Sequence, residues 1–389
     1  MRMKNTALLT GPYDWDPVLL PQAEFQSRLA QVRRVLTEQR VTALVVHGNS
    51  LEYGALAYLT GFVPKLGPAF ALIEREGPNR LLVAGSVAML PAAKRLTWVE
   101  DVRSIRDLKT SLADWLSKVT NTDDKAVGLW GEELMTLRVN IAIQAAIQPF
   151  GRIVELHPWL EQLRAEKSSC EREMLRRAGG ILAVAGDSFL RAAGKGCGVR
   201  ASALAAERAA YESGAQDTRI LASRRDGGPP IAFDTPSDPV VNPIISCIAV
   251  RFAGYWAEGF ITSVTSRGSV ACAQRALSAM LAQARPGATF RELESFGGHN
   301  ISPYKRHPFI ANHGVNSIGL TLDEMTERET REGSELRIGG VYTLRAGAAG
   351  EGSDNAIVSA LIAVDDSKTE ILWSAISAAS DCSLARDSQ

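Results

Sequence analysis

The cysteines of this chain lack the spacing that metal sites and redox pairs require. The five cysteines lie far apart, with no Cys-x-x-Cys motif: Cys170, Cys197, Cys247, Cys272 and Cys382. Cys247 stands in an apolar run with Ile248 and Val250 and has no histidine close in sequence, which favours a small buried side chain over a nucleophile. The scattered pattern indicates reduced thiols in a cytoplasmic protein.

A glycine cluster, GKGCG at 194–198, does not have the spacing of a phosphate-binding loop. It follows a predicted helix, and glycine just beyond the last helical residue is typical of a helix C-terminus. The cluster therefore predicts the end of a helix and no nucleotide site.

The N-terminal part of the chain alternates helical and strand-like patterns. Apolar residues recur at helical spacing from 22 to 39. Strand-like runs are found at 41–46, 70–73, 81–83, 98–102 and 126–129. This alternation is typical of an α/β domain, which we expect to span residues 1–160.

The C-terminal part predicts long helices followed by β runs. We expect helices at 168–193, with Ser169 as the N-cap, at 201–214 and at 270–284. The β runs at 244–252, 335–344 and 356–364 do not alternate regularly with helices. We therefore expect an α+β domain at residues 161–389.

Charge and hydropathy exclude several kinds of partner. The 43 basic and 43 acidic residues balance to zero, which argues against nucleic acid and anionic membrane surfaces. No apolar run approaches the ~20 residues that span a bilayer, and the N-terminus has no apolar segment typical of a signal peptide. We expect a cytoplasmic protein.

Several segments carry a family resemblance by their order and spacing. They are VTALVV (41–46), YLTGF (58–62), GYWAEGFIT (254–262), NSIGLTLDE (316–324), GGVYTLRAG (339–347) and DNAIVSALIAV (354–364). Together they resemble the creatinase/prolidase/methionine-aminopeptidase family over nearly the whole chain. The resemblance implies an α/β N-terminal domain, an α+β C-terminal domain of the pita-bread fold, and a homodimer.

The resemblance also implies where metal ions bind in other members, and those positions are replaced here. Metal-dependent members carry Asp, Asp, His, Glu and Glu as ligands. The matching positions hold, in order, Cys247, Glu258, Asn316, Arg345 and Asn355. Two dications need several carboxylate oxygens, whereas Arg345 brings a permanent cation without a lone pair. We therefore expect no metal and no other cofactor.

Further polar residues are predicted near this cavity. By the resemblance, the family's substrate-contacting histidine falls on Asp323, and an upstream histidine falls near Phe233. His313, like His307, either enters the cavity or stays in a surface loop. Tyr255 and Trp256 lie shortly before Glu258 in sequence, and strand alternation places one of them in the core. The predicted substrate-binding residues are Cys247, Tyr255, His313, Asn316, Asp323 and Asn355.

The N-terminal domain of such proteins often completes the active site of a partner subunit. By the resemblance, Lys65 either binds a substrate anion there or is a solvated loop lysine.

Creatinase works without metal, so the resemblance allows chemistry in the altered cavity. We predict Glu258 and Arg345 as catalytic residues. Arg345 would hold a substrate carboxylate, and Glu258 would move a proton during C–N hydrolysis, elimination or another proton transfer on a small, amino-acid-like molecule.

The alternative is a catalytically inactive pseudopeptidase that serves as a binding or scaffold protein, as in histone-chaperone domains of this fold. An open cavity with Glu258 unpaired favours the enzyme, and a filled cavity with Glu258 held by Arg345 favours the scaffold.

Overall fold

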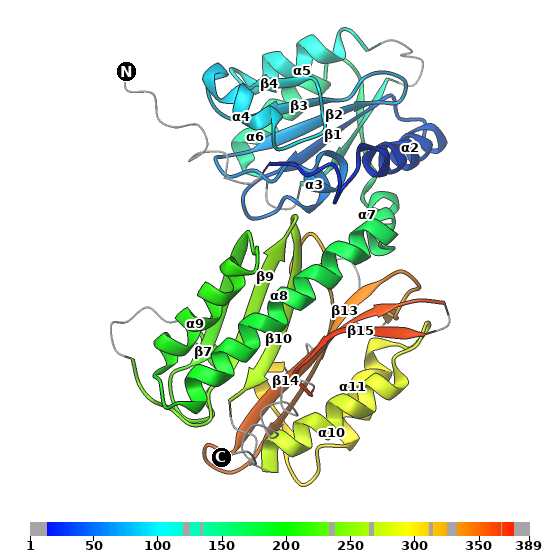
Figure 1. Cartoon of the computed structure of the whole chain (residues 1–389). Coiled ribbons are helices and arrows are strands. Elements are labelled where there is room, and N and C mark those ends of the chain that lie inside the picture. Colours follow the sequence, from blue (N-terminus) through cyan, green and yellow to red (C-terminus); the bar gives the residue numbers. More distant parts are fainter. Residues whose placement is uncertain are drawn as a thin grey trace. The chain divides into compact units, whose positions relative to one another are not determined.

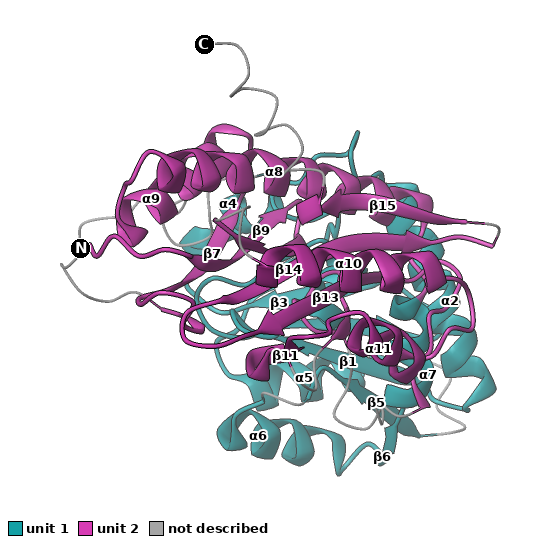
Figure 2. Cartoon of the chain, turned by 90° about the horizontal axis from the view of Figure 1, so that it is seen from below, with its two compact units in different colours: residues 1–165 teal, residues 166–389 magenta. Residues whose placement is uncertain are grey.

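The computed structural model describes residues 14–119, 125–132, 135–232, 238–263, 268–310, 314–324, 333–366 and 368–376. The chain divides into two compact units, residues 1–165 and 166–389 (Figure 2). Residue 160, the boundary expected from the sequence, falls inside the last helix of the first unit, His157–Ala165.

The first unit is a mixed six-stranded sheet with helices on both faces (Figure 1). The strand order is β4-β3-β2-β1-β5-β6. The strands are β1 (Ala43–Gly48), β2 (Ala69–Glu74), β3 (Arg80–Val83), β4 (Val102–Ser104), β5 (Ala126–Trp130) and β6 (Arg152–Glu155). The helices are α2 (Gln22–Glu38), α3 (Gly54–Thr60), the short 3-10 helix η1 (Val87–Met89), α4 (Leu90–Lys94), α5 (Leu108–Leu116), α6 (Leu137–Ile147) and α7 (His157–Ala165).

The central strand β1 is apolar almost throughout because both of its faces are covered. All of its residues are buried, as is typical of a central strand between two helical layers. Val45 packs on one face with Trp115 of α5 and Ile143 of α6. At the end of β1, a Cβ on Gly48 would lie 2.7 Å from Leu56 of α3, so glycine permits the close approach of that helix.

The second unit consists of two antiparallel sheets with helices packed against them (Figure 1). Its helices are α8 (Ser169–Gly194), α9 (Val199–Glu212), α10 (Gly268–Gln283), α11 (Phe290–His299) and the 3-10 helix η2 (Pro308–Ile310). Its strands are β7 (Asp217–Ser223), β8 (Pro230–Ile231), β9 (Ile245–Phe252), β10 (Tyr255–Thr262), β11 (Lys305–Arg306), β12 (Val315–Ser317), β13 (Val341–Ala349), β14 (Asn355–Val364) and β15 (Thr369–Ser374). One sheet has the order β10-β9-β7-β8 and the other β11-β13-β14-β15, with β12 also paired to β13.

Helix α8 covers the outer face of β10, and two glycines allow this close packing. A Cβ on Gly259 of β10 would lie 2.4 Å from Trp373 and 3.1 Å from Leu182 of α8. A Cβ on Gly179 of α8 would lie 2.9 Å from the carbonyl oxygen of Leu372 in β15. The glycine inside α8 therefore lets β15 approach the helix, which offsets its cost in helix propensity.

Strands β10 and β14 connect the two sheets through side chains. The amide of Phe260 donates to Ser359 Oγ at 2.7 Å. Thr262 Oγ1 donates to the carbonyl of Ile357 at 2.8 Å and accepts from the amide of the same residue at 3.0 Å. These bonds bring β10 and the β13–β14 hairpin together and so unite residues far apart in sequence.

Three predicted boundaries are wrong for identifiable reasons. The N-cap of α8 is Ser168 and not Ser169, because the Ser168 side chain accepts from the Glu171 amide while Glu171 bonds back to Ser168, which is a capping box. The predicted strand at 98–102 is reduced to the start of β4 at Val102. The predicted strand at 335–344 begins only at Val341, after a turn at Gly339 with φ +80.

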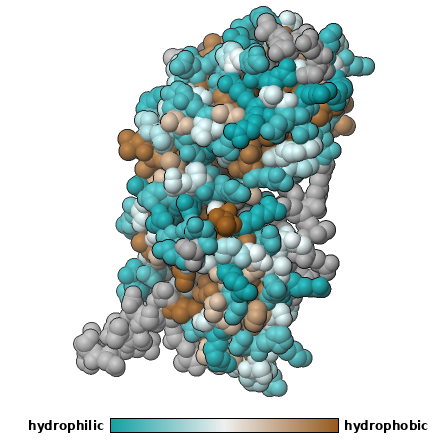
Figure 3. All heavy atoms as spheres, turned by 90° about the vertical axis from the view of Figure 1, so that its right-hand side faces the viewer, coloured by the Kyte–Doolittle hydropathy of each residue, from teal (hydrophilic) through white to brown (hydrophobic). Residues whose placement is uncertain are grey.

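No helix in the described ranges is long and apolar enough to cross a membrane. On the face of the molecule in Figure 3, small groups of hydrophobic side chains lie scattered among hydrophilic ones. This mixture agrees with the mean hydropathy of −0.03.

Candidate functional site

A tight hairpin places Cys247 and Glu258 on one face of their sheet. The turn between β9 and β10 consists of Ala253 and Gly254, whose φ angles are +48 and +89. Positive φ at both central positions is typical of the turns that best join two antiparallel strands. The resulting register pairs Cys247 with Phe260 and Ala249 with Glu258. Directly paired residues share a face, so Glu258 is a diagonal neighbour of Cys247.

Arg345 of β13 holds Glu258 by two hydrogen bonds. Its Nε and Nη2 donate to the same oxygen, Glu258 Oε1, at 3.0 and 2.7 Å. The two side chains are only 10% and 11% exposed. The guanidinium also lies 5.5 Å from the ring centre of Phe260. This is a largely buried, charge-assisted pair in which each charge compensates the other.

Cys247 is a neutral thiol in an apolar environment. It packs with Ile245, Phe260, Ile310 and Ile357. Burial raises the pKa of the Cys247 thiol well above its usual range, and the charge of Glu258 raises it further, although Arg345 acts in the opposite direction. The thiolate is the form that attacks substrates and binds metals, so Cys247 is suited to neither role here.

The two carboxamides at former ligand positions hold backbone loops. Asn316 in β12 is 4% exposed, and its Nδ2 donates to the carbonyl of Leu322 at 2.8 Å. Asn355 at the start of β14 donates through Nδ2 to the carbonyl of Gly227 at 2.9 Å. Both side chains therefore stabilise the loops around the cavity.

Tyr255 does not share the cavity with Glu258, so its predicted role in substrate binding is wrong. Adjacent residues of a strand point to opposite faces. Tyr255 lies on the face covered by α8, where its hydroxyl donates to Glu171 Oε1 at 3.1 Å. Its neighbour Trp256 lies on the same face as Glu258, because the two residues are two positions apart in β10.

Other predicted residues are exposed or lie outside the described residues. Asp323 is exposed, and its carbonyl accepts from Thr321 Oγ1. The next residue, Glu324, forms a buried ion pair with Lys167 at 2.6 Å. His313 and Phe233 lie outside the described residues.

His307 is a buried, structural histidine. Its exposed fraction is 5%, and its Nδ1 accepts from the amide of Phe309 at 3.2 Å. Burial lowers the pKa of the His307 imidazole, so the neutral ring is favoured.

The donor groups at the former ligand positions do not fit a pair of metal ions. One carboxylate, Glu258, is present, and it is bound by a guanidinium. Among the described residues, no group of three or more His, Cys, Asp or Glu side chains is arranged to hold a metal ion. Two dications need several anionic oxygens, and this face offers a permanent cation in their place.

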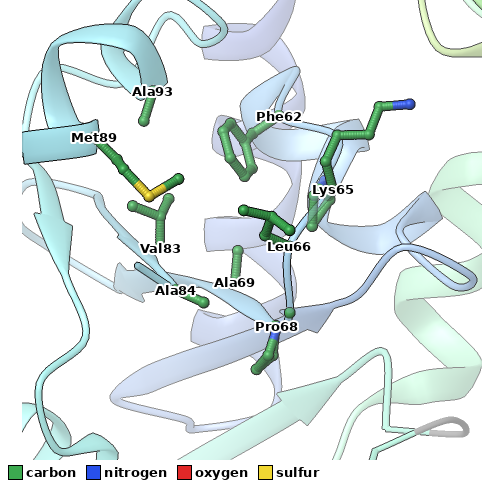
Figure 4. A pocket seen from close by; sticks show the side chains of 11 residues that line it. Phe62, Lys65, Leu66, Pro68, Ala69, Val83, Ala84, Met89 and Ala93 are labelled. Carbon is green, nitrogen blue, oxygen red and sulfur yellow. The ribbon is translucent and has the colours of Figure 1, made fainter. Parts of the chain in front are cut away.

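Lys65 belongs to a small apolar pocket within the first unit. Phe62, Leu66, Val83 and Met89 are among the residues that line it (Figure 4). Figure 4 shows the ammonium group of Lys65 pointing away from this pocket. The lining of this pocket is therefore apolar, and the charged group of Lys65 is not part of it.

Sequence reasoning named Trp256 and Arg345 near Glu258 but did not identify Phe309, Arg219 or Arg251. Phe309 packs edge-on against Phe260, with ring centres 6.0 Å apart. Arg219 and Arg251 both lie over Trp256, at 4.8 and 5.5 Å from the ring centre. The alternation along DTRILAS (217–223) indicates which residues of β7 share a face, but the register with β9 is set by tertiary structure.

Comparisons with known proteins agree with this architecture. The family model for the creatinase/prolidase N-terminal domain matches residues 28–165. A search of curated proteins found no significant match. Among solved structures, prolidase from Pyrococcus horikoshii OT3 is similar with a TM-score of 0.70 and 18% identity, covering 89% of this chain and 97% of that one.

Two further solved structures extend the likeness over nearly the full length. X-Pro aminopeptidase from Thermotoga maritima MSB8 has a TM-score of 0.68 and 20% identity, with 89% and 97% of the two chains covered. Escherichia coli aminopeptidase P has a TM-score of 0.70 and 16% identity, with 94% and 99% covered. Identities this low establish the fold alone. The chain therefore has the pita-bread fold of these proteins, and residues 28–165 match a creatinase/prolidase N-terminal domain.

Proposed function

We propose that this chain is a pita-bread protein without metallopeptidase activity, which binds a small polar molecule at its altered cavity and does not hydrolyse it. The observation that carries this proposal is the Arg345–Glu258 pair, with bonds of 2.7 and 3.0 Å. The one carboxylate at the former ligand positions is occupied by a cation of the protein itself.

The surroundings of the pair support binding over catalysis. A general base must accept a proton from its substrate, and a carboxylate held by two guanidinium hydrogen bonds is poorly placed to do so. Cys247 is protonated, and the two carboxamides are engaged with backbone carbonyls. Phe260 and Phe309 add an apolar contact beside the pair. The pairing of Glu258 with Arg345 is the arrangement expected of a pseudopeptidase.

The test measures metal dependence directly. The protein is stripped with a chelator, and Mn²⁺, Co²⁺ or Zn²⁺ is added while an Xaa-Pro dipeptide is assayed for hydrolysis and the melting temperature is followed. We expect no hydrolysis and no saturable metal-induced stabilisation, with Escherichia coli aminopeptidase P as the positive control. A metal that stabilises the chain and starts dipeptide hydrolysis would show the proposal to be wrong.

The second candidate is metal-independent chemistry on an amino-acid-like substrate, with Arg345 as anchor and Glu258 as proton carrier. It is favoured by the remaining exposure of the pair, 10% and 11%, which leaves an approach for a small molecule. A substrate carboxylate would have to replace Glu258 on Arg345 and thereby release it as a base. Glu258→Gln separates the two candidates, because it would abolish turnover in an enzyme while leaving binding by Arg345 intact.

A further inference from the structure

The inner face of the β7–β9–β10 sheet holds more positive than negative charge around Glu258. The paired registers give cross-strand rows on one face: Asp217, Arg251 and Trp256 form one row, and Arg219, Ala249 and Glu258 form the next. Together with Arg345, the described residues of this face provide three arginines and two carboxylates. The outer face of this sheet is covered by α8, so these residues lie on the side away from the helix.

Arg219 crosses this face over a small residue. Its row partner is Ala249, yet its guanidinium lies 4.8 Å from the ring centre of Trp256, which is in the next row and two strands away. Strands are about 4.8 Å apart, so the side chain must pass over β9 to reach the ring. The methyl group of Ala249, which is 3% exposed, leaves room for this path.

The guanidinium of Arg219 is oriented but not neutralised. The Trp256 ring below it is 2% exposed and is therefore fixed. A guanidinium held over a ring by a cation–π contact keeps N–H donors available for another partner. Arg219 itself is exposed, and in the described part of the chain no acidic side chain forms an ion pair with it. Arg251, in contrast, is buried and lies 3.6 Å from Asp217.

We propose that Arg219, held across Ala249 on Trp256, binds the carboxylate of a small molecule on the inner face of this sheet, beside the Glu258–Arg345 pair. The planar guanidinium of an exposed arginine matches a carboxylate in a two-bond arrangement. The excess positive charge of the face selects an anion over a neutral or cationic molecule. This inference rests on the proposed binding function and names the class of ligand.

The experiment titrates the full-length protein with acetate, succinate, glutamate and inorganic phosphate at constant ionic strength, with chloride as reference and succinamide as the neutral counterpart of succinate. Melting temperature and calorimetry report binding. We expect saturable stabilisation by at least one carboxylate and none by succinamide. If no carboxylate stabilises the protein beyond chloride, or if only phosphate does so, the assignment to a carboxylate is wrong.

Three variants locate the site. Arg219→Gln is expected to weaken the binding carboxylate about tenfold or more, because a charge-assisted pair of hydrogen bonds is lost. Arg219→Lys keeps the charge but not the planar fork, so it is expected to fall between Arg219→Gln and the wild type. The matched control is Arg208→Gln, which changes an exposed arginine outside this sheet, on helix α9. This variant is expected to bind the carboxylate as the wild type does.

Ala249→Leu tests the path of the side chain. A larger residue at 249 would displace Arg219 from Trp256 without changing the charge of the protein. Weaker binding of the carboxylate by this variant therefore supports the placement of Arg219 over Trp256. Undiminished binding in Arg219→Gln would overturn the proposal. The metal and dipeptide assays are independent of these variants, so loss of the proposed function and loss of this site give different results.

Discussion

Replacing one partner of the Glu258–Arg345 pair should destabilise the second unit strongly, while replacing both should not. The pair is almost buried and joined by bonds of 2.7 and 3.0 Å. Breaking a buried pair from one side costs about 3–5 kcal/mol, since a charge stays behind in a low-dielectric environment. We expect Arg345→Met and Glu258→Met each to lower the free energy of unfolding by about 3 kcal/mol. For a unit of this size that is roughly 6–12 °C in melting temperature.

The double variant shows whether the two charges stabilise each other. With both charges removed and apolar side chains in their place, the penalty for an uncompensated charge disappears. We expect the Glu258→Met, Arg345→Met double variant to unfold within about 1 kcal/mol of the wild type, so two single losses of about 3 kcal/mol each give a coupling energy of about 5 kcal/mol. The same cycle on Arg208 and Glu212, whose side chains are 81% and 63% exposed, should show little or no coupling, because solvent screens an exposed pair.

The assay must report the second unit alone. Native-state hydrogen exchange of peptides from β10 and β13 measures the opening free energy of the strands that carry the pair. If the two single effects simply add in the double variant, the pair is not a coupled buried unit. In that case the argument that Arg345 occupies Glu258, and with it the proposed loss of peptidase chemistry, fails.

Three further predictions concern single elements. Ser168→Ala removes the capping box of α8 and should cost about 1 kcal/mol, seen as faster amide exchange in the first turn of the helix. Lys167→Met leaves Glu324 without its 2.6 Å ion-pair partner, where the side chains are 1% and 5% exposed; we expect a loss of about 3 kcal/mol in urea unfolding, which Glu324→Gln in the same chain should largely restore. The pKa of the Cys247 thiol is raised in the folded chain, whereas in the unfolded chain it is expected near its usual value of about 8.5. Above that pH the unfolded chain loses a proton that the folded chain keeps, so the free energy of unfolding falls as the pH rises. Cys247→Ala should remove up to about 1.4 kcal/mol per pH unit of that alkaline decline, and an equal decline in both proteins would contradict it.

The fold could be predicted well from sequence because its signals are local. The helical periodicity from residue 22 and the apolar run of β1 identified elements that form where they were expected. The order of the family segments identified the fold, which the structure and its neighbours confirm. Errors arose at ends of elements, as at Ser168, where a side-chain bond three residues ahead decides the boundary.

The site could be predicted only in part, because its geometry depends on contacts distant in sequence. The segment order implied that Arg345 and Glu258 meet, and their side chains are bonded. The face of the sheet on which Tyr255 lies could not be predicted, since alternation along a strand does not say which of the two faces is covered by a helix. The position of Arg219 depends on the register of β7 with β9, which nothing in its own segment specifies.

The balance of charge connects these observations. A site for two dications must be strongly anionic before the metals bind. The face described here instead contains two ion pairs, Glu258–Arg345 and Asp217–Arg251, and a further exposed cation. The Glu258–Arg345 pair compensates itself, so it needs no ion from solution. The exposed cation, Arg219, lies over an aromatic ring, and no acid among the described residues forms an ion pair with it. If this face binds a ligand, electrostatics therefore requires the ligand to be an anion, which is the reverse of what the same face would bind if it carried carboxylates.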